Sequence, residues 1–168
     1  SMEELALTDE DENEYLNRIF DSEMLLAQLN IREFISVLPE SKAKQLLYFA
    51  WLCTLESCSL FRKAGNGLKK KSKPPVYGPG GAFSFALEKI IVKSKAIIED
   101  YSPDDNGPVP NLYVESAVNM GVRSESNSID LVLFSPPYAN CFDYTKIYYL
   151  ELWFGGFVNS VADQKNIR

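Results

Sequence analysis

The chain of 168 residues contains no histidine and only three cysteines. Without histidine, neither a Ser-His-Asp nor a Cys-His nucleophilic arrangement can be built from this chain. Cys53, Cys58 and Cys141 are odd in number and share no repeated spacing, which argues against a disulfide framework and against a zinc site. We therefore expect no metal. Cys53 and Cys58 lie in an apolar segment, where buried structural thiols are expected.

Long apolar runs and a signal sequence are also lacking. No stretch approaches the roughly 20 apolar residues that cross a bilayer. The N-terminus is acidic and has neither the basic nor the apolar region of a signal peptide. We therefore expect a cytoplasmic protein with no membrane partner, built as one domain or a large piece of one.

Charge is unevenly distributed along the chain. The net charge is -6 and the pI about 4.8, a balance that disfavours a free-standing nucleic-acid binder. One basic stretch nevertheless has no acid inside it, and its side chains could contact DNA phosphates or form a solvated loop. These candidate DNA-binding residues are Arg62, Lys63, Lys69, Lys70, Lys71 and Lys73.

The first 110 residues predict a helical segment. Apolar spacing indicates helices over 9–30, 42–63 and 83–101, the second with Ser41 as its N-cap. Residues 31–38 form a short apolar segment that Pro39 ends. Residues 64–82 hold five glycines and three prolines and predict a mobile basic loop.

The remaining residues, 111–168, change to the pattern of an α/β fold. Residues 112–114 predict a short strand, and the apolar run 129–134 predicts a strand buried on both faces of a parallel sheet. An aromatic-rich helix is expected over 143–156, mainly as core. Strand, turn and helix in this order place a site at the carboxyl end of the strand. We expect the two segments to form one structural unit.

The turn after the apolar run reads Ser135-Pro136-Pro137-Tyr138. A small polar side chain followed by a proline carbonyl supplies two hydrogen-bond acceptors. Proline has no N–H and a fixed φ, so the carbonyl direction is preset. An aromatic side chain next in line can stack on a base flipped out of a duplex.

This motif and the run before it resemble the catalytic motif of amino-methylating DNA methyltransferases, which reads Asp, Asn or Ser, then Pro-Pro, then an aromatic. The stretch 130–156 is similar to bacterial DNA modification methylases of restriction-modification systems, and residues 41–73 resemble, more weakly, the segment before the motif in some of them. The resemblance implies a partial Rossmann-like methyltransferase sheet with a helix-rich N-terminal half.

The same resemblance implies the function and the roles of the motif. The reaction would move a methyl group from S-adenosylmethionine to N4 of cytosine or N6 of adenine in double-stranded DNA with a flipped base. Ser135 and the carbonyl of Pro136 would accept hydrogen bonds from the target amine. Pro137 would make the turn rigid, and Tyr138 would stack on the base.

The glycine-rich turn that holds the methyl donor in this family is not found. Gly65-Asn66-Gly67 is predicted to follow a helix, and the turn 78–81 has no predicted strand before it and contains a proline. We therefore expect a fragment, a truncated frame or half of a split enzyme, inactive in isolation and completed by a companion segment or subunit. A homodimer through an exposed aromatic helix is a further expectation.

Three other functions compete with this one. A non-catalytic methylase-like subunit that binds DNA or assists assembly fits the missing glycine turn. Methylation of RNA or protein amides is disfavoured, because that motif begins with Asn where Ser135 stands. Methylation of C5 of cytosine requires a thiol directly after a proline, whereas Cys141 lies three residues beyond Tyr138, so it is rejected.

Overall fold

The computed structural model describes residues 16–65, 67–100, 111–113, 116–122, 124–135, 144–158 and 163. The chain divides into two compact units. The first comprises 1–101 and 142–168, and the second comprises 102–141. Each unit is described by itself. The helices after residue 143 thus belong to the same unit as the N-terminal helices, whereas the sequence pattern predicted them in one segment with the rest of 111–168.

The first unit begins with a helical turn over 16–19, followed by α2 (Ser22–Val37). Asp21 separates them: its side chain accepts a hydrogen bond from the backbone N–H of Met24 at 2.9 Å and caps α2. One continuous helix over 9–30 was therefore wrong within the described residues. Residues 31–37, predicted as a separate segment, belong to α2.

The next helix, α3 (Lys42–Cys58), begins as predicted. Ser41 caps it by accepting a hydrogen bond from the N–H of Lys44 at 3.1 Å. It ends five residues earlier than the predicted residue 63. Cys58 is buried as expected, but Cys53 is exposed.

An antiparallel hairpin, β1 (Phe61–Ala64) and β2 (Gly67–Lys70), replaces the start of the predicted loop 64–82. Its register pairs Phe61 with Lys70 and Arg62 with Lys69. Gly65 turns the chain at a φ of 56°, which a glycine adopts without strain. The loop prediction was wrong for these residues because two short strands satisfy each other's backbone groups.

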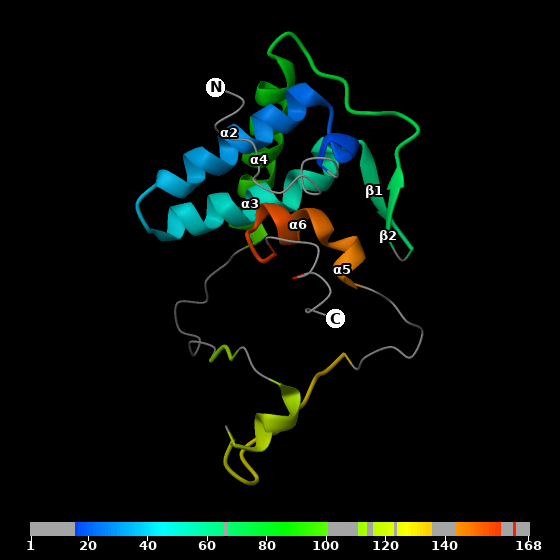
Figure 1. The fold of residues 1–168 in the computed structure, drawn as a ribbon. Coiled ribbons are helices and arrows are strands. Elements are labelled where there is room, and N and C mark those ends of the chain that lie inside the picture. Colours follow the sequence, from blue (N-terminus) through cyan, green and yellow to red (C-terminus); the bar gives the residue numbers. More distant parts are fainter. Residues whose placement is uncertain are drawn as a thin grey trace. The chain divides into compact units, whose positions relative to one another are not determined.

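The last long helix, α4 (Gly81–Asp100), matches the helix predicted from 83. Its N-terminus is capped from α2, since Oε1 of Glu23 accepts a hydrogen bond from the N–H of Ala82 at 2.8 Å. In Figure 1, α4 packs against α2 and α3, and α6 (Tyr149–Phe154) lies against α3 after the short α5 (Tyr144–Ile147).

Aromatic side chains form the centre of this core. The ring of Phe154 lies edge-on to those of Phe20 and Trp51, with ring centres 5.7 and 5.8 Å apart. Nε1 of buried Trp51 donates a hydrogen bond to Oε1 of buried Gln28 at 2.8 Å. Tyr48 donates to the carbonyl of Gly155 at 2.8 Å. The aromatic helices at 144–154 are thus mainly core, as expected, although Tyr144 and Tyr148 are exposed.

The second unit contains a 3-10 helix, Ala117–Val122, and no strand among its described residues. Residues 112 and 113 and the run 129–134 lack strand structure. The described residues of these two segments form no strand here, because a strand needs neighbouring strands and the described residues of this unit supply none; residue 114 lies outside the described residues. The helix-rich first half is confirmed, whereas the only sheet in the described part of the chain is the two-stranded hairpin.

None of the helices in the described ranges is both long enough and apolar enough to cross a membrane.

Candidate functional site

Of the Ser-Pro-Pro-Tyr motif, the structure describes Ser135 alone. Ser135 is exposed at the end of the run 129–134. Pro136, Pro137 and Tyr138 lie outside the described residues. The predicted roles of all four residues stay predictions. Cys141 and Asp143 also lie outside the described residues.

The run leading to Ser135 exposes its large apolar side chains. Leu131, Leu133 and Phe134 are 73%, 87% and 79% exposed, and Ile129 and Val132 are exposed by more than half. Adjacent residues of an extended chain point to opposite sides, so this run is apolar on both sides. Such a pattern is typical of a strand covered on both faces, and the described residues of this unit leave it uncovered.

The six basic candidates fall into two groups in the structure. Lys63 and Lys71 are partly buried and bonded within the first unit. The other four, Arg62, Lys69, Lys70 and Lys73, are exposed.

Lys63 anchors the hairpin to α6. Its Nζ lies 2.5 Å from Oε1 of Glu151 and 4.1 Å from the ring centre of Tyr148. Both Lys63 and Glu151 are largely buried, with side chains 25% and 19% exposed. This ion pair holds β1 in place and leaves Lys63 poorly placed to reach a phosphate.

Lys71 closes the C-terminal end of α3. Its Nζ donates to the carbonyls of Glu56 at 2.7 Å and Ser59 at 2.8 Å. A cation at a helix C-terminus satisfies carbonyls that have no partner within the helix. Burial lowers the pKa of Lys71 from its ordinary 10.5, and the charge of Glu56 acts in the opposite direction. Lys71 is thus a structural residue of the fold.

Arg62 and Lys69 lie opposite each other on the two strands of the hairpin. Residues opposite each other lie on the same face of the hairpin, so the two positive charges are neighbours on the face toward solvent. Phe61 and Leu68, on the other face, pack against the core. Like charges in such a pair are destabilising unless an anion lies nearby. Among the described residues, no ion pair involves either side chain. The arrangement suits a phosphate.

The sequence pattern placed these six basic residues in one group and did not distinguish the two partly buried lysines from the four exposed residues. Gly65-Asn66 between the two four-residue runs is a hairpin signal that could have revealed it, because the turn sets the register and hence the facing pairs. The partly buried Lys63 could not be recognised this way, since its partner Glu151 lies 88 residues away.

Neither glycine-rich turn fits a methyl-donor site. Gly65 lies in the turn between two antiparallel strands and Gly67 begins the second strand, so β2 and not a helix N-terminus follows the turn. The turn before α4 leads into a helix whose N-terminus already receives the carboxylate of Glu23. A negatively charged ligand group would have to displace that carboxylate. Neither turn therefore forms the glycine-rich cradle that the methylase resemblance implies for S-adenosylmethionine.

No group of three or more histidine, cysteine or acidic side chains is arranged for metal binding within the described ranges.

Comparison with curated proteins finds relatives of one class. The chain is 34% identical over 126 residues to the type II methyltransferase M.AvaI of Nostoc sp. (strain PCC 7120 / SAG 25.82 / UTEX 2576), and equally to M.AvaI of Anabaena variabilis. These matches cover 65% of this chain and 26% of each relative. It is also 41% identical over 63 residues to the type II methyltransferase M.BsoBI of Geobacillus stearothermophilus, covering 38% of this chain and 11% of that protein.

The chain thus spans about a quarter of the length of the M.AvaI relatives. No family model matches it, and no solved structure matches it. The predicted resemblance to bacterial DNA modification methylases is confirmed by the three relatives.

Proposed function

We propose that the chain carries the target-base portion of a DNA methyltransferase, because it is similar to a part of bacterial type II methyltransferases. The observation that supports the proposal is 34% identity to M.AvaI over 65% of the chain, together with the Ser-Pro-Pro-Tyr motif in the same sequence. The acceptor is the exocyclic amine of cytosine N4 or adenine N6, in double-stranded DNA with the base flipped out.

In this proposal, Ser135 and Pro136 hold the target amine. The hydroxyl of Ser135 and the carbonyl of Pro136 accept its two N–H groups, which orients the nitrogen for attack. Tyr138 stacks on the base, and Pro137 fixes the turn between them. Exposure of Ser135 is compatible with this role, since the side chain must reach a base that arrives from outside.

The methyl donor of the proposed reaction is S-adenosylmethionine, the donor that the methylase resemblance implies. The described residues of this chain do not fit it, so its site is assigned to a companion segment or subunit. The same companion would cover the run 129–134, pairing it as a strand within a Rossmann-like sheet. The 168-residue chain alone is then inactive.

The exposed basic face of the hairpin contacts the DNA backbone. Arg62 and Lys69, with Lys70 and Lys73 nearby in sequence, position the duplex through phosphates and carry no sequence specificity. Lys63 and Lys71 take no part, because both are bonded inside the fold.

Substitution of Ser135 tests the proposal. In the full gene product, Ser135→Ala should reduce methyl transfer to DNA by about a hundredfold or more, since it removes an acceptor from the reacting amine. Ser124→Ala is the matched control, because Ser124 is an exposed serine of the same unit. Equal activity of the two variants would reject the assignment of the motif.

A second candidate is a non-catalytic subunit that binds DNA or assists assembly. The observation in its favour is the lack of a donor cradle among the described residues. Calorimetry with S-adenosylmethionine and the full gene product separates the two. Micromolar binding supports the enzyme, whereas DNA binding without donor binding supports the subunit.

A further inference from the structure

Helix α4 exposes an apolar stripe beside the positions that pack against the core. Ala82, Ala86 and Ile90 are buried against α2 and α3. Around the helix from them, Leu87, Ile91 and Ile98 are 38%, 54% and 58% exposed. With Ser94 they recur in steps of four, three and four residues, which is the spacing of a helix–helix seam.

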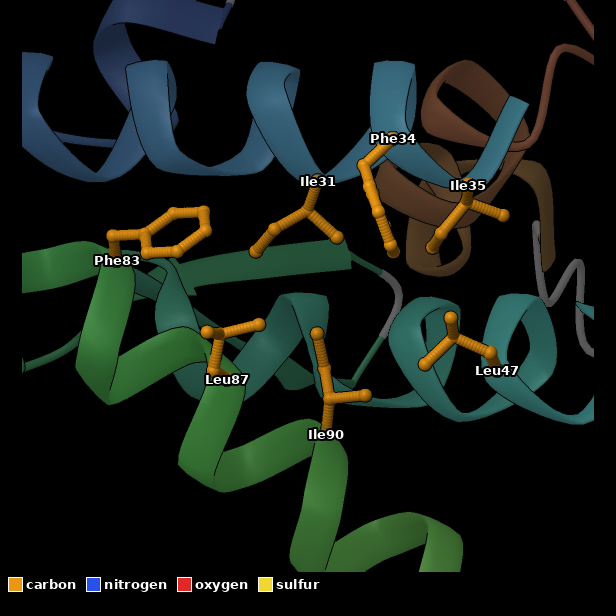
Figure 2. Close-up of a pocket in the computed structure, with 7 residues that line it drawn as sticks. All are labelled: Ile31, Phe34, Ile35, Leu47, Phe83, Leu87 and Ile90. Carbon is orange, nitrogen blue, oxygen red and sulfur yellow. The ribbon is translucent and has the colours of Figure 1, made fainter. Parts of the chain in front are cut away.

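An apolar groove lies beside this stripe (Figure 2). Its volume is about 220 Å³, and only apolar side chains line it. Among them are Ile31, Phe34 and Ile35 of α2, Leu47 of α3, and Phe83 and Leu87 of α4. Leu87 belongs to both groove and stripe, so the two form one apolar surface across α2 and α4.

The walls of the groove decide the kind of occupant. They are helices, whose backbone groups are already paired, so they offer side-chain contacts and no hydrogen bonds to a bound backbone. An occupant must satisfy its own backbone, as an amphipathic helix does.

Two opposite charges flank the stripe at matching positions. Glu88 and Lys95 are exposed and lie seven residues apart, which puts both on one side of the helix beside the apolar positions. A second α4 running antiparallel would bring Glu88 next to Lys95 of the second copy, and Lys95 next to Glu88 of the second copy. In a parallel pairing these positions of the two copies would lie on opposite edges of the seam, so Glu88 and Lys95 would not meet each other.

From this complementarity we propose that the surface binds a second copy of the chain, through an antiparallel pairing of the two α4 helices. In this register Leu87 packs against Ile98 of the second copy, and Ile91 against Ser94 of the second copy. The symmetry is twofold, so every contact occurs twice. The second α4 covers the side of the groove that Leu87 forms.

Charge reversal tests the proposal by sedimentation over a range of concentrations. The unmodified chain should show a monomer–dimer equilibrium. E88K and K95E each create two like-charge contacts and should each raise the dissociation constant by about tenfold or more. An equimolar mixture of the two variants restores opposite charges at both contacts and should form a heterodimer as tight as the original homodimer.

The matched control is K93E, which reverses an exposed lysine of α4 outside the stripe. Its dissociation constant should equal that of the unmodified chain, and circular dichroism should show all variants folded. A chain that stays monomeric at every concentration overturns the proposal. A chain that associates only with a companion polypeptide, and not with itself, overturns it too. A mixture of E88K and K95E that remains monomeric overturns it as well.

Discussion

Nζ of Lys63 and Oε1 of Glu151 lie 2.5 Å apart and join the hairpin to α6 across 88 residues of sequence. The second carboxylate oxygen of Glu151 is buried and has no hydrogen-bond partner among the described residues. Lys63 is therefore the group that compensates this carboxylate.

Lys63→Met should lower the free energy of unfolding by about 1–3 kcal/mol, because it leaves the charge of Glu151 buried and unpaired. Lys69→Met is the matched control on the other strand, and its stability should stay within about 0.5 kcal/mol of the unmodified chain. Urea denaturation followed by circular dichroism measures both. Equal losses for the two variants would show that the ion pair contributes nothing specific.

Arg62→Gln and Lys69→Gln, made together, should weaken binding to a duplex oligonucleotide without affecting folding. Each lost phosphate contact should flatten the dependence of log K on log salt by about one unit of slope. Fluorescence anisotropy at several salt concentrations measures this slope. Lys93→Gln removes an exposed charge from α4 and serves as the control. A slope unchanged by the double substitution would remove the hairpin from the DNA interface.

Gln28→Ala should destabilise the core because it removes a buried hydrogen bond. Oε1 of Gln28 accepts from Nε1 of Trp51 inside the core, and its loss leaves that N–H unsatisfied. The expected cost is about 1–3 kcal/mol in the free energy of unfolding. Gln45→Ala, an exposed glutamine of α3, should change it little. Similar effects of the two substitutions in thermal unfolding would contradict the role of Gln28.

The buried thiol of Cys58 should make the fold sensitive to alkaline pH. Burial raises its pKa from 9.0 to about 11. In the unfolded chain the thiol ionises first, so stability is fully present below pH 9 and is lost as the pH rises toward 11. The loss attributable to Cys58 is about 1–3 kcal/mol.

Cys58→Ala should flatten this part of the pH profile, measured as the free energy of unfolding between pH 8 and 11. Lys71, whose pKa is lowered, acts with the opposite sign, and it is present in both proteins. The difference between the two profiles therefore reports the thiol together with its charge interaction with Lys71. Parallel profiles would show that Cys58 does not ionise in this range.

Local signals in the sequence were sufficient for part of the fold. The N-cap Ser41 and the apolar spacing of α4 are read within one or two turns, and both helices start within two residues of the predicted positions. Asp21 was overlooked because its apolar neighbours continue the helical spacing across the cap. The hairpin was overlooked because the glycine and lysine content of 64–82 suggested a loop more strongly than Gly65-Asn66 suggested a turn.

Prediction of the candidate site depended on a short motif and on contacts between residues distant in sequence. Ser135 was singled out by a short motif and a family resemblance, which need no tertiary structure. The division of the basic residues depends on Glu56 and Glu151, which are distant in sequence from Lys71 and Lys63, and only the fold brings them together. The run 129–134 was predicted as a strand from its own composition, yet a strand forms only with partners that the described residues do not supply.

Nucleoside mass spectrometry of DNA treated with the full gene product and S-adenosylmethionine tests the proposed methyl transfer and its target. We expect N4-methylcytosine or N6-methyladenine in the DNA, its loss in Ser135→Ala, and its retention in Ser124→Ala. Methylation that persists undiminished in Ser135→Ala, or a product methylated on carbon 5 of cytosine, would show that the motif does not hold an exocyclic amine.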